Sequence, residues 1–174
     1  MRTTACSAIA LVCLASSSLI SAQSSSLLEK RSEAAGFAGT LKFAIGRAAR
    51  DCRDTLEKDD TYMRAIVNDW LSRNGRYSAA AELWVSVFVT AIARQEGREQ
   101  GDKLMNHFMN EARTRGIETS GWMIGVSKDE KKAKCQKYEA MVHSGVYDIT
   151  PAMPQYKNLV DLATYVEKNF NDDD

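Results

Sequence analysis

The sequence places few side chains at spacings that support metal or acid–base chemistry. His107 and Glu111 lie four positions apart, which would put both on one side of a helix, where they could hold one edge of a metal ion. A metal site needs at least three ligands, and neither an HExxH nor a CxxC pattern accompanies them. We therefore interpret the pair as part of a solvent-exposed helix face.

The other histidine, His143, precedes Ser144-Gly145 at the expected end of a helix. There an imidazole can bond the terminal carbonyl groups and complement the helix dipole, which we favour over general-base catalysis. From the order of residues, no serine or cysteine can be recognised as a nucleophile activated by a histidine, and the CxxCH haem-attachment pattern is absent. A haem held by His and Met without a covalent bond stays open, although methionines at helical spacing are usually core residues. No cofactor is expected, and an enzyme is the least favoured class.

Glu82 lies within the most apolar run of the chain, residues 79–93, AAAELWVSVFVTAIA. On a period of 3.6 residues, Glu82, Ser86 and Thr90 form one polar line and the other positions are apolar. We expect this line to face solvent. The alternatives are that Glu82 pairs inside the protein with an arginine such as Arg47, or that the polar line faces a groove.

Residues 79–93 predict a central helix that is buried on most of its circumference. The alternation of valines at 85, 87 and 89 would also fit a strand. The three leading alanines, the ARQE continuation and the lack of a second strand-like run favour a helix. The run is shorter than the ~20 residues that a bilayer requires and contains Glu82, so we expect no membrane span in the mature chain.

Trp122, Met123 and Ile124, between Gly121 and Gly125, form the best candidate contact surface. Aromatic and methionine side chains on an exposed loop suit the recognition of a partner protein. The alternative is that Trp122 closes one end of the bundle.

The remaining apolar positions repeat at helical spacing between polar breaks. We expect a second helix to begin at an N-cap of Asp60 or Thr61 and to end at Asn74-Gly75, and a capping box, Ser127 to Glu130, to begin a later one. The other expected helices cover 34–56, 79–93, a segment from Leu104 to Ala112, and 155–169. The sequence therefore predicts an all-α, single-domain bundle of five to six helices that are mostly antiparallel.

The start of the chain has the features of a secretory signal peptide. Arg2 precedes an apolar stretch, and small residues lead to a cleavage site after Ala22. We divide the chain into a signal peptide (1–22), a flexible polar segment (23–33), the helical bundle (34–170) and an acidic tail (171–174). Lys30-Arg31 is a conceivable dibasic processing site, which we interpret as an ordinary charged pair. The mature protein is expected to be secreted or periplasmic.

Charge and cysteine content fit this location. The chain holds 23 basic and 23 acidic residues, so no long-range field points to nucleic acid. Removal of the signal peptide takes away Cys6 and Cys13 and leaves Cys52 and Cys135. In an oxidising compartment this pair predicts one disulfide, which places the first helix beside the capping-box helix.

Some short motifs resemble those of a loose group of small exported bacterial proteins. They are an early cysteine, Cys52, with Tyr62 after it; the W-x-x-R-N segment Trp70 to Asn74; and a late cysteine, Cys135, before the turn Gly145 to Ile149. The resemblance implies an exported, all-helical protein with a disulfide, and it carries no catalytic residues.

These observations favour a protein that acts by binding. A partner protein in the envelope or outside the cell is the first expectation, which includes an inhibitor or an immunity-type protein for an envelope toxin. A carrier of a small apolar ligand or haem within the bundle is the second, and an enzyme of unrecognised type is the third.

Overall fold

The computed structural model describes residues 10–121 and 127–170. Within this part of the chain there are five helices and no strand. They are α1 (Ala10–Thr55), α2 (Asp60–Glu96), α3 (Arg98–Thr119), α4 (Lys128–His143) and α5 (Tyr156–Phe170). The predicted all-α bundle with one disulfide is therefore confirmed.

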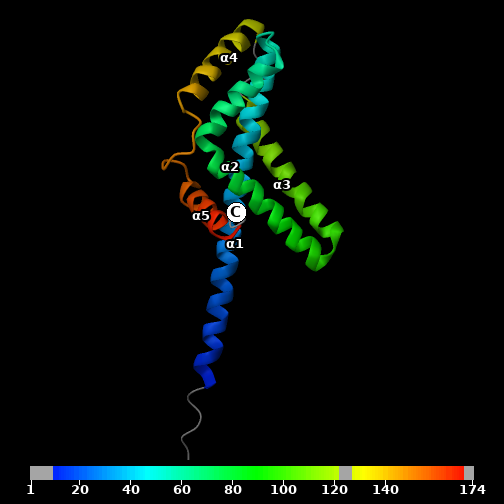
Figure 1. The fold of residues 1–174 in the computed structure, drawn as a ribbon, viewed down its shortest axis with the longest axis vertical. Helices are drawn as coiled ribbons and strands as arrows, with labels where there is room; N and C mark the ends of the chain where they lie inside the picture. The colour runs from blue at the N-terminus through cyan, green and yellow to red at the C-terminus, as the bar shows by residue number, and fades with distance from the viewer. Residues whose placement is uncertain (1–9, 122–126, 171–174) are drawn as a thin grey trace, which may run out of the picture.

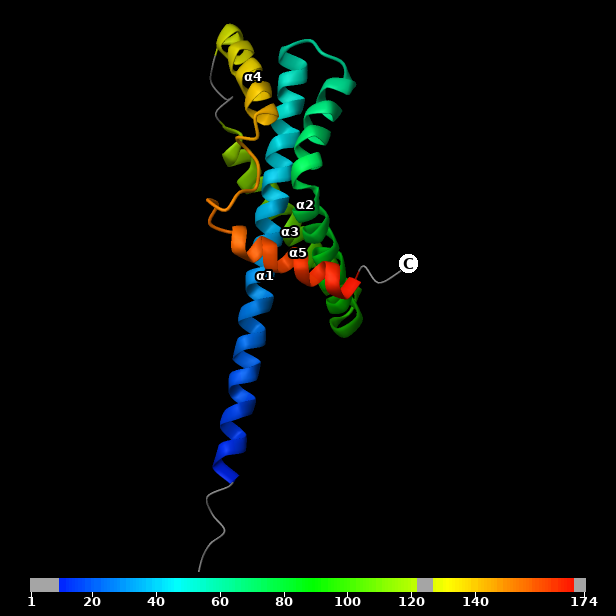
Figure 2. The ribbon, with the colours of Figure 1, turned by 60° about the vertical axis from the view of Figure 1, so that its left-hand side comes forward.

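The second half of α1 is the axis of the bundle, and α2, α3, α4 and α5 all contact it. Its alanines at positions 34, 35, 38, 48 and 49 are almost fully buried, and these short side chains let the neighbouring helices approach closely. The first half of α1 extends away from the other helices (Figure 1). In Figure 2, α5 runs across α1 and α2 rather than along them.

Residues 23–33, which the sequence predicts to be flexible, are helical within α1. Leu27 and Leu28 are exposed, and Arg31 contacts α5. The guanidinium of Arg31 lies 3.8 Å from the ring centre of Tyr165, and its Nε donates to Asp161 at 2.9 Å. The division of the chain into signal, flexible segment, bundle and tail stays a prediction, and residues 1–9 and 171–174 lie outside the described part.

The apolar run 79–93 is helical, as predicted, but its expected central position is wrong. Trp84 is buried, whereas Val85, Val87 and Val89 are only half-buried. The run lies in the C-terminal half of α2, and α2 contacts α3 as well as α1. One side of the run therefore keeps contact with solvent.

The predicted helix end at Asn74-Gly75 is also wrong, because α2 continues without a break from Asp60 to Glu96. The N-cap is Asp59, one residue before the expected position, and its carboxylate accepts from the amide of Thr61 at 2.9 Å. The α2 helix ends instead at Gly97, which has a φ of 99°.

The capping box at the start of α4 is present as predicted. Ser127 Oγ accepts from the amide of Glu130 at 3.3 Å, and the carboxylate of Glu130 accepts from the amide of Ser127 at 3.0 Å. Further along α4, Cys135 forms the disulfide with Cys52, and both cysteines are fully buried. The disulfide fixes α4 against α1, as the sequence predicts.

Candidate functional site

A pocket of about 230 Å³ opens between α1, α2 and α3. Its lining is almost entirely apolar, with Glu82 and two serines as its polar members. The residues that form it are Ala35, Gly36 and Gly39 of α1; Ser78, Ala81, Glu82, Val85 and Ser86 of α2; and Met105, Phe108, Met109 and Ala112 of α3. We call it the apolar pocket.

Two glycines hold α3 against its neighbours at either end of this pocket. A Cβ added at Gly101 would lie 2.6 Å from the Cβ of Ala93 on α2, and one added at Gly116 would lie 2.6 Å from the ring of Phe43 on α1. These two contacts are separated by about 22 Å of helix. Only a glycine permits so close an approach at either point.

Between these contacts, glycines of α1 leave space rather than close it. A Cβ at Gly36 would meet no atom within 4 Å, and one at Gly39 would touch only the Cβ of Ala112 at 3.7 Å. The apolar pocket therefore has two causes. Near its ends α3 lies close to α2 and α1, and between these points α1 has no side chains at Gly36 and Gly39 to fill the space.

A second cleft, of about 320 Å³, lies between α1 and α3. It shares Gly36 and Phe108 with the apolar pocket and is lined in addition by Ser32, Glu33, Thr40, Leu104, His107, Glu111 and Arg115. We call it the polar cleft. The ring of Phe108 packs edge-on against Phe88 of α2, at 6.4 Å between centroids.

Glu82 lies at the mouth of the apolar pocket, where 61% of its side chain is exposed. Its carboxylate accepts from Lys42 Nζ and from Ser78 Oγ, and its partner is not Arg47, which lies near Asp51 instead. The polar line therefore faces solvent and also borders a pocket, two of the arrangements that the sequence allows. Whether Glu82 contacts a ligand stays a prediction.

The proposed contact residues Trp122, Met123 and Ile124 lie outside the described residues. His107 is exposed and Glu111 is half-buried, both border the polar cleft, and Glu111 forms a salt bridge with Arg115 at 3.0 Å. Among the residues that the structure describes, no group of three acidic, histidine or cysteine side chains could hold a metal ion. No helix in this part of the chain is long and apolar enough to cross a membrane.

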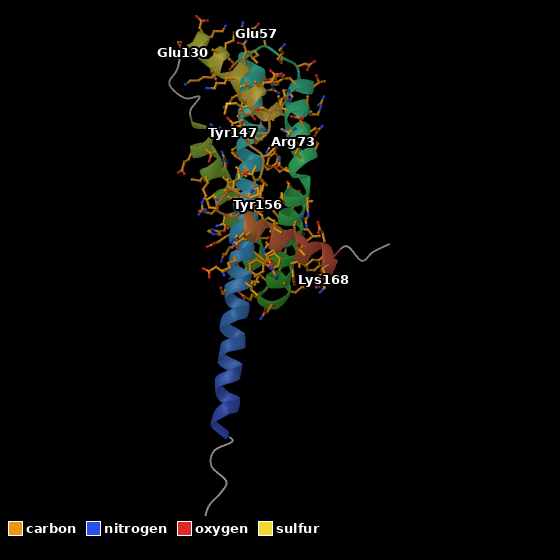
Figure 3. All side chains as sticks on the ribbon, turned by 90° about the vertical axis from the view of Figure 1, so that its left-hand side faces the viewer. Glu57, Arg73, Glu130, Tyr147, Tyr156 and Lys168 are labelled. Atoms are coloured by element: carbon orange, nitrogen blue, oxygen red, sulfur yellow. A yellow bond between two sulfur atoms is a disulfide. The ribbon has the colours of Figure 1, made fainter. Side chains whose placement is uncertain are left out.

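The structure brings together the two motifs that the sequence shows far apart. Trp70, which is fully buried, donates from its indole to the carbonyl of Tyr147 at 2.9 Å. Figure 3 labels Arg73 and Tyr147, which mark the two segments, α2 and the loop between α4 and α5. The W-x-x-R-N segment thus holds the turn after α4, and we call this contact the α2 clamp.

Asn74 is the centre of the α2 clamp and is 1% exposed. Its side-chain amide donates to Asp148 Oδ1 at 2.9 Å, and its Oδ1 accepts from the amide of Ile149 at 2.7 Å. A second donation goes to the carbonyl of Trp70 within α2. These bonds explain why α2 continues here: Asn74 is used as a tertiary hydrogen-bonding group, not as a helix end.

Arg73 completes the clamp from the same turn of α2. Its Nε donates to Asp148 Oδ2 at 2.8 Å, and its Nη2 donates to the carbonyl of Val142 at 2.6 Å. It therefore caps the last turn of α4 from a neighbouring helix. Gly145, with a φ of 76°, makes the turn, and a Cβ there would lie 2.8 Å from the Asp148 carboxylate.

His143 lies in the last turn of α4, where we expected it to complement the helix dipole, but its ring bonds to α2 rather than to a terminal carbonyl group. Its Nδ1 lies 2.9 Å from Asp69 Oδ2 on α2. Hydrogen bonds from Arg73, and then from His143, hold the pKa of Asp69 below its usual range. These side chains link α2 to the last turn of α4.

Sequence reasoning missed the residues that form the apolar pocket, apart from Glu82. Gly36 and Gly39 are three positions apart in a helix, so they share a face, and that spacing is the one signal that could have found the pocket.

Comparisons with protein-family models, with curated proteins and with solved structures found no match to this chain. The resemblance of its motifs to those of small exported helical proteins therefore stays a prediction.

Proposed function

We propose that this is an exported protein that binds a small apolar ligand in the apolar pocket. The observation that carries the proposal is the pocket itself, about 230 Å³ with an almost entirely apolar lining. An apolar cavity of ~150 Å³ inside a protein can already bind benzene. The apolar pocket is larger and opens to the surface, so a ligand has a path into it.

The lining also suits a ligand of variable shape. Met105 and Met109 form part of the wall, and Met109 is 64% exposed. Methionine side chains are flexible and polarizable, so they adapt to different apolar surfaces. An exposed methionine beside Phe108 and Val85 is therefore more useful for binding than for stability.

Export is proposed on independent grounds. The signal-like residues 1–22 and a buried disulfide, Cys52–Cys135, both fit an oxidising compartment. N-terminal sequencing of the protein from its native source is expected to begin at Gln23. An uncleaved chain in the cytosol with two reactive thiols would overturn this part.

Binding is tested with a neutral apolar fluorophore, phenylnaphthylamine, titrated into the protein. The matched variants are Gly36→Leu and Gly46→Leu, because both sites lie in α1 and a Cβ at either meets no atom within 4 Å. Only Gly36 lines the pocket. We expect saturable binding to the unchanged chain and to Gly46→Leu. For Gly36→Leu, whose side chain fills the pocket, we expect binding that is weaker by at least about ten-fold.

Two results would contradict the proposal. One is the absence of saturable binding to the unchanged chain, and the other is equal affinity for the two variants. Mass spectrometry of the natively purified protein would identify a retained ligand, and a visible absorbance band would identify it as haem.

The expectation of a partner protein stays a prediction, since Trp122, Met123 and Ile124 lie outside the described residues. It is tested by a pull-down from the native secreted or envelope fraction. Loss of a stoichiometric partner on Trp122→Ala, with unchanged thermal stability, would support it.

A further inference from the structure

The apolar pocket and the polar cleft meet at two residues. Gly36 of α1 and Phe108 of α3 line both. The boundary between the two spaces therefore runs between a glycine, which contributes no side chain, and one aromatic ring. A ligand that occupies the apolar pocket and extends past Phe108 enters the polar cleft.

The two ends of this path differ in chemistry. The lining of the apolar pocket includes the apolar side chains of Ala35, Val85 and Met105. The polar cleft instead has charged side chains, and Glu33 and Arg115 on its rim are exposed to solvent. Water-exposed charges at one end and an apolar space at the other match an amphiphile, whose chain leaves water while its head group stays hydrated.

The charges in the polar cleft favour a cationic head group. Arg115 Nη2 is already paired with Glu111 Oε2 at 3.0 Å. Glu33 forms no salt bridge with any residue that the structure describes. The cleft therefore holds one more carboxylate than guanidinium groups, and Phe108 offers an aromatic ring beside it, to which a cation is also attracted.

We propose that the two spaces form one site for a single-chain amphiphile with an ammonium head group. Its hydrocarbon chain occupies the apolar pocket, passes between Gly36 and Phe108, and places the ammonium group in the polar cleft beside Glu33. This inference rests on the proposed function and adds the class of ligand.

The test compares three ligands with twelve carbons in their chains: dodecyltrimethylammonium, dodecanol and dodecanoate. Each is used below its micelle concentration, or for dodecanol below its solubility limit, to displace phenylnaphthylamine from the full mature chain. We expect the ammonium compound to bind about five-fold more tightly than dodecanoate, since one exposed charge pair contributes on the order of this ratio. The preference is expected to fall as salt is added.

The variant Glu33→Gln is expected to abolish the preference for the ammonium head and to leave dodecanol binding unchanged. The control is Glu29→Gln, an exposed residue one turn earlier in α1 that lines neither space and is expected to keep the preference. Gly36→Leu is expected to weaken the binding of all three ligands, because it blocks the path common to them.

The outcomes separate the two proposals. If dodecanol and phenylnaphthylamine bind but the head groups are not distinguished, or dodecanoate is preferred, the ligand class is wrong and the binding function stands. An ammonium preference that survives Glu33→Gln would also overturn the assignment of the head-group position. If no apolar compound binds, both proposals fail.

Discussion

The two halves of α2 are used in opposite ways. At the α2 clamp, in the N-terminal half, Trp70 and Asn74 are buried and bonded to the loop after α4. In the C-terminal half, Val85 is half-buried and lines the apolar pocket, and half-buried Phe88 packs against Phe108 of α3. The N-terminal half has few ways to change without losing stability, whereas the C-terminal half keeps apolar surface that the fold itself does not cover. In this account, stability and the proposed binding therefore depend on different parts of one helix.

The described side chains support this contrast in another way. Among them, no fully buried polar side-chain atom lacks a hydrogen-bond partner. The clamp therefore has its buried polar groups satisfied, which is the condition under which such a network rigidifies a fold. Local opening is expected to be rarer at the clamp than at the α3 side.

The largest expected effect comes from removing the disulfide that joins α1 and α4. In Cys52→Ser with Cys135→Ser, the free energy of unfolding is expected to fall by about 4 to 5 kcal/mol, because the crosslink closes a long loop of the unfolded chain. Chemical denaturation measures this change. While the variant remains folded, its affinity for phenylnaphthylamine should be unchanged; a parallel loss of binding would show that the two regions are not separate.

The clamp itself is tested by Asn74→Ala. The carboxylate of Asp148 and the amide of Ile149 would each lose a partner, so we expect a destabilisation of about 2 to 3 kcal/mol. The control is Asn68→Ala, an exposed position on the same helix, with a change within about 0.5 kcal/mol. Equal effects at the two positions would contradict the role given to Asn74.

The α3 side is tested by Gly101→Ala, whose Cβ would lie 2.6 Å from that of Ala93. We expect the free energy of unfolding to fall by about 1 to 3 kcal/mol through overpacking. We also expect weaker phenylnaphthylamine binding, because α3 would move outward. Gly36→Ala, where a Cβ meets no atom within 4 Å, is expected to stabilise the protein by up to about 1 kcal/mol through helix propensity. Thermal unfolding is expected to show a lower melting temperature for Gly101→Ala and a higher one for Gly36→Ala. Shifts of the same sign would contradict a close contact at Gly101 and open space at Gly36.

The smallest effect concerns pH. Hydrogen bonds from Arg73, and then from His143, lower the folded-state pKa of Asp69. Its contribution to stability is therefore complete above the ordinary aspartate pKa and is lost as the pH falls below about 4 toward the folded pKa. The difference in unfolding free energy between the unchanged chain and Asp69→Asn should stay constant near neutral pH and shrink in acid; a difference that grows in acid would have the wrong sign.

The sequence was sufficient where one short segment decides the structure. The capping box at Ser127 and Glu130 is local, so its residues alone indicate the start of α4. The disulfide followed from an even number of cysteines in a chain that we expect to be exported. The helical form of residues 79–93 followed from their composition and from the absence of a strand partner.

The sequence was insufficient where contacts between distant segments decide the structure. Asn74-Gly75 has the local features of a helix end, but the bonds of Asn74 to Asp148 and Ile149 outweigh them. The apolar pocket could not be predicted, because it depends on how closely α3 approaches α1 and α2. That distance is set by Gly101 and Gly116, whose role is visible only when Ala93 and Phe43 are placed opposite them.

The most direct test of this account is the ratio of phenylnaphthylamine dissociation constants for Gly36→Leu and Gly46→Leu. Both variants add the same side chain to the same helix, and only Gly36 borders the apolar pocket. The account predicts that Gly36→Leu binds at least about ten-fold more weakly, and equal dissociation constants would contradict it.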